Sequence, residues 1–132
     1  MSRKNLQVAE AFYSAWARGD HSGLMVLLDP EVEYVNPDGA IEPGVRKGLD
    51  GYIAAVEKLQ EGWASWRMYP ERFVPVRDKV AVVYRYEAQA RSSGVAIEGR
   101  ESALVTLREG KIVRYEWFHE PGDALIAVGL EG

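Results

Sequence analysis

The chain has 132 residues, 47% of them hydrophobic and 27% charged, with a net charge of −4 and no cysteine. These values fit one domain over residues 1–132 and exclude a largely disordered chain, disulfides and thiolate chemistry. The acidic balance and the lack of a lysine or arginine run argue against nucleic-acid binding. No apolar run is long enough for a membrane span or a secretory signal, so we expect a cytoplasmic protein with no membrane partner.

The N-terminal part of the chain has the spacing of two helices. Apolar residues recur at three- and four-residue intervals over residues 3–18, which predicts a helix that ends at Gly19. Asp20 is placed to cap a second helix, which we expect to run through Leu28. Pro30 is expected to end this second helix.

A short strand and a third helix follow. Residues 32–36 alternate as a strand that ends on Asn36, and residues 37–48 are typical of a glycine- and proline-rich loop. Residues 49–60 return to helical spacing, and either Tyr52 or Ile53 completes the apolar stripe.

From residue 66 onward the pattern changes to the two-residue period of strands. The segments 66–77, 79–91, 95–108 and 111–119 are each predicted to form a strand. Two prolines in the first of them indicate a bent or edge strand. Gly110 marks a hairpin turn between the last two strands.

Helices followed by a run of strands predict an α+β fold, with helices on one face of a largely antiparallel sheet. Long strands that bend around helices would leave a pocket at the open end. The four Trp and seven Tyr against three Phe favour an amphipathic cavity, because Trp and Tyr carry polar atoms that require partners. The tail, residues 123–130, is expected to form one or two helical turns.

Four segments resemble one family. They are "AFYSAWARGDHSGLMVLLDPEVEYVNPDG", "GLDGYIAAVEKL", "REGKIVRYEWF" and "DALIAVGL", which together span nearly the whole chain. The chain is similar to SnoaL-like proteins of the nuclear-transport-factor-two-like superfamily, which also holds ketosteroid isomerase and polyketide cyclases. This resemblance implies a cone-shaped, curved antiparallel or mixed sheet wrapped around three N-terminal helices, with a deep apolar cavity. It also implies a homodimer through the outer sheet face, where we expect Val83, Leu104 and Phe118 to be exposed.

The resemblance also implies which positions would carry isomerase chemistry. A base, a helix tyrosine and a protonated carboxyl are needed for that reaction. Here the matching positions hold Asn36, Phe12 and Ala103, none of which supplies the required group. The chain is therefore not expected to isomerise steroids by that route.

Glu101 and His119 are the candidate acid–base groups. Glu101 shares a strand face with apolar residues, and the hairpin at Gly110 would place it opposite or diagonal to Trp117 and His119. His119 would face the cavity at the end of the last strand. The alternatives are that Glu101 pairs with Arg100 or a neighbouring strand, and that His119 only bonds backbone or water.

Asn36 is the third candidate, either as a polar anchor for substrate or as a simple turn former before Pro37. Neither a phosphate loop nor a dinucleotide turn is found, and His21 and His119 are the only histidines, so no cofactor or metal is expected. Aromatic and small residues expected to line a substrate cavity are Phe12, Trp16, Tyr34, Tyr52, Trp66, Tyr84, Tyr86, Ala103, Tyr115 and Trp117.

Two functions from different classes remain open. The first is a cofactor-independent acid–base enzyme, an isomerase, cyclase, dehydratase or hydrolase, acting on an apolar cyclic or polyketide-like molecule. The second is a non-catalytic module that binds a small apolar ligand or associates through the sheet. The two differ in whether Glu101 and His119 point into one cavity.

Overall fold

The computed structural model describes residues 2–40 and 42–129. Ile41 of the predicted loop and Leu130 of the predicted tail lie outside these residues. In chain order, the elements are α1 (Ser2–Arg18), α2 (His21–Met25), β1 (Leu28–Asn36), β2 (Gly44–Lys47), α3 (Gly48–Gly62), β3 (Trp63–Val76), β4 (Lys79–Ala90), β5 (Ala96–Arg108), β6 (Lys111–Phe118) and α4 (Asp123–Ala127).

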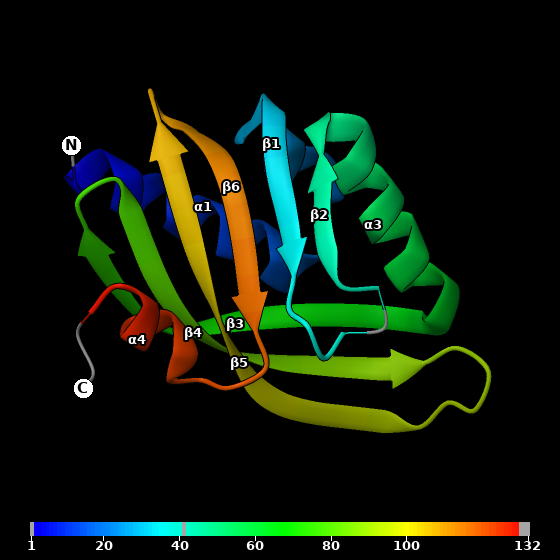
Figure 1. Ribbon diagram of the computed structural model, residues 1–132. Coiled ribbons are helices and arrows are strands. Elements are labelled where there is room, and N and C mark those ends of the chain that lie inside the picture. The colour runs from blue at the N-terminus through cyan, green and yellow to red at the C-terminus, as the bar shows by residue number, and fades with distance from the viewer. Residues whose placement is uncertain (1, 41, 130–132) are drawn as a thin grey trace.

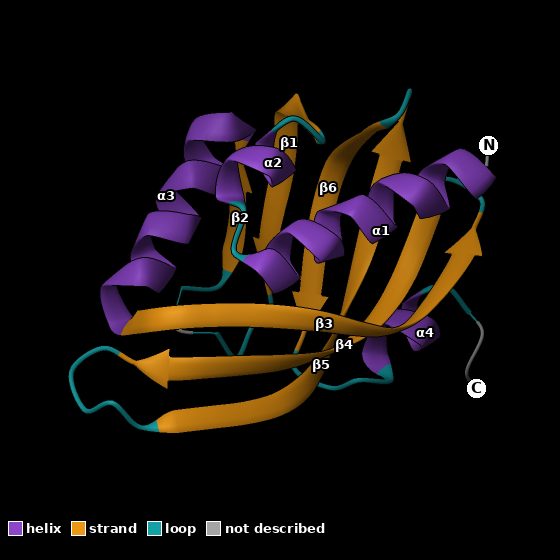
Figure 2. Ribbon diagram, turned by 180° about the vertical axis from the view of Figure 1, so that it is seen from behind, coloured by secondary structure: helices purple, strands orange, loops and turns teal. Residues whose placement is uncertain are grey.

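The strands form one curved, unclosed sheet, which confirms the predicted α+β class. Their order is β2-β1-β6-β5-β4-β3, and all neighbours are antiparallel except the parallel pair β1 and β6, so the sheet is mixed. Figure 1 shows β3, β4 and β5 extending past the other strands and bending beneath α3. From behind, α1 crosses the inner face of the sheet while α3 stands beside β1 and β2 (Figure 2). The sheet therefore curves around α1, with α3 beside its β1 and β2 end.

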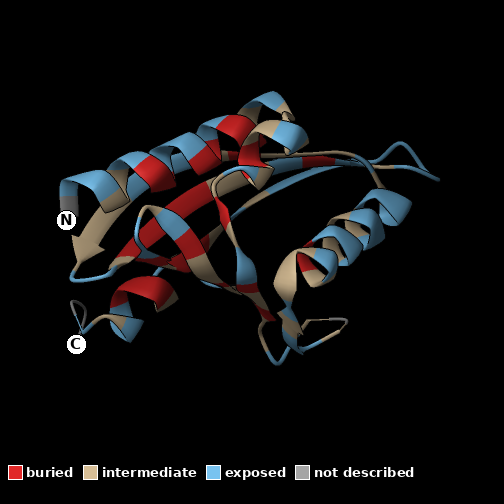
Figure 3. Cartoon of the chain, turned by 90° about the horizontal axis from the view of Figure 1, so that it is seen from above, coloured by how far each residue is buried: buried red, intermediate tan, exposed pale blue. Residues whose placement is uncertain are grey.

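Helix α1 supplies one side of the core. Its apolar stripe places Phe12 and Tyr13 completely out of solvent, with Trp16 also buried. These side chains pack against inward-facing residues such as Val82 and Val105. Figure 3 shows buried stretches on α1 and on the strands that it covers. Among the described residues, no helix combines the length and the apolar character that crossing a membrane requires.

The turn after α1 contains Gly19 and the Asp20 cap as predicted, but the second helix is shorter than expected. Gly19 has a positive φ of 71°, and the Asp20 side chain accepts a hydrogen bond of 2.9 Å from the Gly23 amide. Helix α2 then ends at Met25, and the prediction that it continues through Leu28 is wrong. Leu28 instead begins β1, paired with Ile112 of β6.

Pro30 lies inside β1 rather than ending a helix. Proline cannot donate to a strand ladder, and the pairing register with β6 accordingly shifts between Leu28 and Glu33. The glycine- and proline-rich segment after Asn36 also contains an element that the sequence did not reveal. Its last residues form β2, a short and mostly exposed edge strand that pairs with β1.

The other strand and helix predictions are confirmed with small changes at their ends. Strand β3 starts earlier than predicted, at Trp63, and its register shifts near Pro70, as expected for a strand at the sheet edge. In α3, Tyr52 is buried whereas Ile53 is 40% exposed, which settles the two alternatives. The hairpin between β5 and β6 has Gly110 at a φ of 78°.

The apolar residues on the outer face of the sheet are buried, which differs from the prediction that they are exposed. Val83 and Leu104 were expected to be exposed, but they are 5% and 8% exposed because α4 packs over them. Phe118 packs against the same cluster through its partly buried ring. The C-terminal turns therefore cover the apolar patch that had supported association through this face.

Ser102 connects α4 to the sheet through two hydrogen bonds, and replacing it should lower stability. Its buried hydroxyl donates to the Glu120 carbonyl at 2.7 Å and accepts from the Ala124 amide at 3.1 Å. Ser102→Ala leaves both backbone groups without this partner, so we expect the free energy of unfolding to fall by about 1–3 kcal/mol. Urea denaturation measures the loss. Ser22→Ala, at an exposed position, is the control and should change stability by less than about 0.5 kcal/mol.

Candidate functional site

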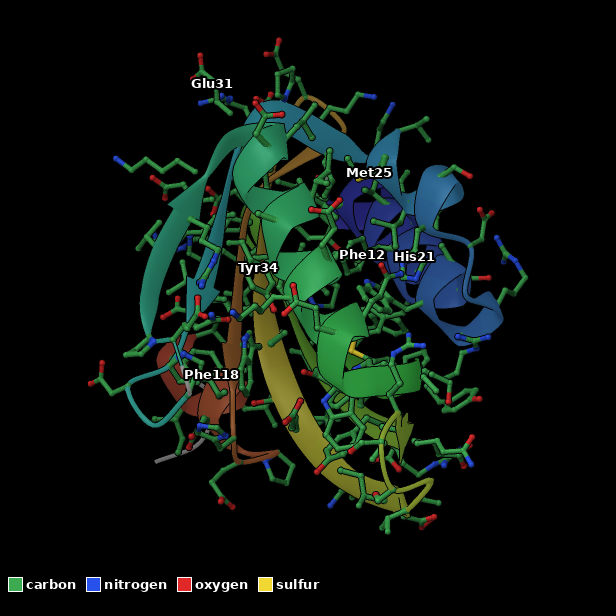
Figure 4. The ribbon with its side chains drawn as sticks, turned by 90° about the vertical axis from the view of Figure 1, so that its right-hand side faces the viewer. Phe12, His21, Met25, Glu31, Tyr34 and Phe118 are labelled. Atoms are coloured by element: carbon green, nitrogen blue, oxygen red, sulfur yellow. The ribbon has the colours of Figure 1, made fainter. Side chains whose placement is uncertain are left out.

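A cavity of about 450 Å³ lies between the inner sheet face, α1 and α3. Figure 4 looks across α3 toward this space, with Tyr34 of β1 on one side and Phe12 of α1 on the other. Most of the predicted site residues line the cavity. They are Asn36, Glu101, His119, Trp16, Tyr34, Tyr52, Trp66, Tyr84, Tyr115 and Trp117.

Three residues that were expected in the lining lie outside it. Phe12 and Ala103 are completely buried in the core that packs α1 against the sheet. Tyr86 instead stacks on Trp66, with ring centroids 4.9 Å apart. Phe12 and Ala103 lie where α1 packs directly on the sheet, so their side chains belong to the core rather than to the cavity wall.

The structure adds lining residues that sequence reasoning missed. Residues 37–40 and 42–47, here called the covering segment, contribute Gly39, Glu42 and Arg46 to the lining. Helix α3 adds Lys58. Four residues of smaller or apolar type complete the set: Ala40, Ala55, Leu59 and Met68. The only signal in the sequence was the length of the segment after Asn36, which exceeds what a tight turn requires.

Glu101 is the carboxyl group that reaches the cavity from β5. Its cross-strand partner in the ladder is Tyr84, whose hydroxyl donates to Glu101 Oε1 at 2.9 Å. Burial raises the pKa of Glu101 to about 7, against a smaller lowering by the Tyr84 hydrogen bond. At neutral pH the carboxyl is therefore divided between its protonated and ionised forms.

This pKa makes stability depend on pH in a defined direction. The folded state binds the Glu101 proton more tightly than the unfolded state, so stability is full below the unfolded pKa and declines as pH rises toward about 7. Glu101→Gln removes this decline. We expect the stability of the variant relative to wild type to increase from pH 4.5 to pH 8, measured by urea denaturation. An unchanged difference across this range would contradict the assignment.

Both the oxygen and the nitrogen of the Asn36 side-chain amide form hydrogen bonds. Trp117 Nε1 donates to Asn36 Oδ1 at 2.7 Å, and Asn36 Nδ2 donates to the Glu42 carbonyl at 2.8 Å. Asn36 thus ties β1 to β6 and holds the covering segment in place. Within the described part of the chain the amide nitrogen has no second printed acceptor, and Asn36 belongs to the cavity lining.

His119 follows β6 and lies at the exposed mouth of the cavity. Its ring meets Trp117 edge to face, with centroids 4.9 Å apart. The covering segment approaches it closely, because a Cβ placed on Gly39 would lie 3.1 Å from His119 Nε2. Glu101 and His119 therefore line the same cavity, although no hydrogen bond joins them within the described part of the chain.

Several tyrosine hydroxyls gather on the inner side of the sheet. Tyr13 and Tyr115 share a hydrogen bond of 2.6 Å, and the Tyr34 ring lies parallel to Tyr115 at 6.0 Å. Burial raises the pKa of Tyr34 to about 12, with a further contribution from Glu101. Tyr34 and Tyr115 line the cavity, whereas Tyr13 lies in the core with its hydroxyl paired to that of Tyr115. A phenol whose pKa is raised stays neutral at physiological pH.

The described residues form an α+β fold in which the curved sheet, α1 and α3 surround a cavity lined largely by aromatic side chains. The chain belongs to the SnoaL-like domain family, whose family model matches residues 9–115. The resemblance found in the sequence is thereby confirmed.

Known relatives agree with this assignment at the level of the fold. An uncharacterised protein of Mycobacterium tuberculosis strain H37Rv is 26% identical over 115 residues, covering 87% of this chain and 88% of the relative. An NTF2-like protein of unknown function from Burkholderia pseudomallei K96243 superposes with a TM-score of 0.80 at 22% identity, covering 96% and 98% of the two chains.

Two further solved structures carry information about ligands or activity. TerC, crystallised with polyporic acid, has a TM-score of 0.79 at 22% identity and covers 95% of this chain and 98% of its own. A protein of Jannaschia sp. CCS1 assigned as a SnoaL-like polyketide cyclase has a TM-score of 0.76 at 16% identity, covering 98% and 94%. At these identities the likeness establishes the fold.

Proposed function

We propose that the cavity binds an apolar, cyclic, polyketide-like molecule and that the protein transfers a proton on it. The proposal depends on Glu101, whose carboxyl group lies among aromatic side chains and accepts a hydrogen bond from the Tyr84 hydroxyl. A carboxyl that changes protonation near neutral pH can both remove and return a proton. The reaction classes that fit are isomerisation, aldol-type cyclisation and dehydration.

The size and lining of the cavity suit such a ligand. A volume of about 450 Å³ lies within the range of roughly 300–1,000 Å³ that is usual for small-molecule sites. Aromatic rings from Trp66, Trp117 and Tyr34 offer flat apolar contacts for a ring system. The polyporic acid complex of TerC and the cyclase assignment of the Jannaschia protein support this class of ligand by analogy.

The residues divide the chemistry as follows. Ionised Glu101 takes a proton from a carbon next to a carbonyl group; the electron pair of the broken C–H bond forms a carbon–carbon double bond, and the π pair of the carbonyl group moves onto its oxygen. The second N–H of Asn36 and the neutral Tyr34 hydroxyl are the donors that would stabilise this oxygen. Protonated Glu101 then returns the proton to another carbon or to a departing hydroxide. His119 lies at the mouth and would contact the outer part of the ligand.

A non-catalytic binding module is the second candidate. It is favoured by the exposure of His119 and by the hydrogen bonds that already occupy the Asn36 oxygen and one of its N–H groups. In that case the same cavity would hold a ligand without reaction, and Glu101 would only accept or donate one hydrogen bond to it.

Deuterium exchange separates the two candidates without knowledge of the natural substrate. A panel of bicyclic and tricyclic ketones, beginning with 1-tetralone, is incubated with the protein in D₂O and followed by NMR. Binding of the same compounds is measured by thermal shift. Catalysed exchange beside the carbonyl supports the enzyme, and binding without exchange supports the module. If no compound either binds or exchanges, the proposed function fails.

A further inference from the structure

The mouth of the cavity carries two cations and one carboxylate. Arg46 of β2 and Lys58 of α3 both pair with Glu42, and all three residues line the cavity. Lys58 Nζ lies 3.4 Å from Glu42 Oε2, and Arg46 Nη2 donates to Glu42 Oε1. Lys58 also lies 4.0 Å from Glu61, which is 72% exposed and outside the lining, so this second contact is weak. Among the lining residues at the mouth the two cations outnumber the single carboxylate of Glu42, while Glu61 outside the lining offsets part of the Lys58 charge.

The charge of Arg46 reaches the interior of the cavity. Its side chain is only 23% exposed, and its guanidinium lowers the pKa of Tyr34 against the larger raising effect of burial. Partial burial strengthens such interactions, because they are screened less than those at a free surface. A guanidinium has five N–H donors in a planar fork, and Glu42 accepts only some of them.

We infer that the ligand carries a carboxylate at one end, held at the mouth by Arg46 and Lys58. This inference rests on the proposed function and names its substrate class, an aromatic or polycyclic acid. The opposite orientation is unfavourable, because a carboxylate placed inside the cavity would meet Glu101 and repel its ionised form. The acid group thus lies outward, the rings lie among the aromatic side chains, and the atom that exchanges its proton lies toward Glu101.

A matched pair of probes tests this inference. 2-Naphthoate and 2-naphthamide have the same ring system and differ in the negative charge. Isothermal titration calorimetry at pH 7 should give an affinity for 2-naphthoate about tenfold higher than for 2-naphthamide. The difference should shrink at high salt, and it should be largely lost in Arg46→Gln and in Lys58→Gln, through a larger loss of affinity for 2-naphthoate than for 2-naphthamide.

Lys47→Gln is the control for general electrostatics. Lys47 adjoins Arg46 on β2, is exposed and does not line the cavity, so the preference for 2-naphthoate should persist. Equal affinities for the two probes would overturn the inference while leaving the proposed cavity binding intact. Binding of neither probe would overturn the inference, whereas the ketone panel decides the proposed function separately. If Arg46→Gln fails to fold, Lys58→Gln still decides, because the Lys58 side chain is 60% exposed.

Discussion

Replacing Glu101 with glutamine is expected to slow catalysed proton exchange by about 10²- to 10⁴-fold. Glutamine keeps the shape of the side chain and an oxygen that accepts the Tyr84 hydroxyl, but it cannot bind or release a proton near neutral pH. The dissociation constant of a neutral ketone should therefore stay unchanged while the exchange rate falls. NMR measurement of exchange and calorimetric measurement of binding on the same samples separate these two quantities.

Glu98→Gln is the matched control for this experiment. Glu98 lies on the same strand, is exposed and does not line the cavity, so its variant should exchange protons at the wild-type rate. Full activity in Glu101→Gln would remove Glu101 from the mechanism. A loss of activity of similar size in Glu98→Gln would show that removing any negative charge from this strand is sufficient.

Replacing Phe12 with alanine is expected to lower the free energy of unfolding by about 3–5 kcal/mol. The Phe12 ring is completely buried and contacts Tyr13 at 5.5 Å and Tyr115 at 5.2 Å between centroids, so its removal leaves a void under α1. Urea denaturation measures this change. Ile53→Ala on the exposed side of α3 is the control and should change stability by less than about 0.5 kcal/mol.

The same variant tests whether Phe12 belongs to the site. Because Phe12 does not line the cavity, the folded fraction of Phe12→Ala should bind 2-naphthamide with the affinity of wild type. A large loss of affinity with little loss of stability would restore Phe12 to the role that its position in the sequence first suggested.

Most of the fold follows from periodicity, and the exceptions have physical reasons. Leu28 follows a helical stripe, but its backbone pairs with Ile112, and this long-range contact overrides the local pattern. β2 consists of Gly44–Lys47, too short and too exposed to show alternation. Val83 and Leu104 read as exposed because strand alternation alone cannot show that α4 covers them.

The site was predictable where it depends on strand register. The hairpin at Gly110 sets Ala103 opposite Trp117, so Glu101 lies diagonal to Trp117, as its spacing indicated. The positive mouth was not predictable, because Arg46 lies on the short edge strand β2, which shows no alternation, and Lys58 lies on α3, whose position beside β1 depends on tertiary packing. No local pattern in the sequence indicates that these two side chains meet at one cavity.

A crystal structure of the complex with the ketone that exchanges fastest would show whether Glu101 reaches the reacting carbon of a ligand bound in the cavity. We expect the ring system between Trp66 and Trp117, with its exchanging carbon about 3–3.5 Å from a Glu101 carboxyl oxygen. A ligand bound on the outer sheet face, or seated in the cavity with Glu101 out of reach of that carbon, would contradict this expectation.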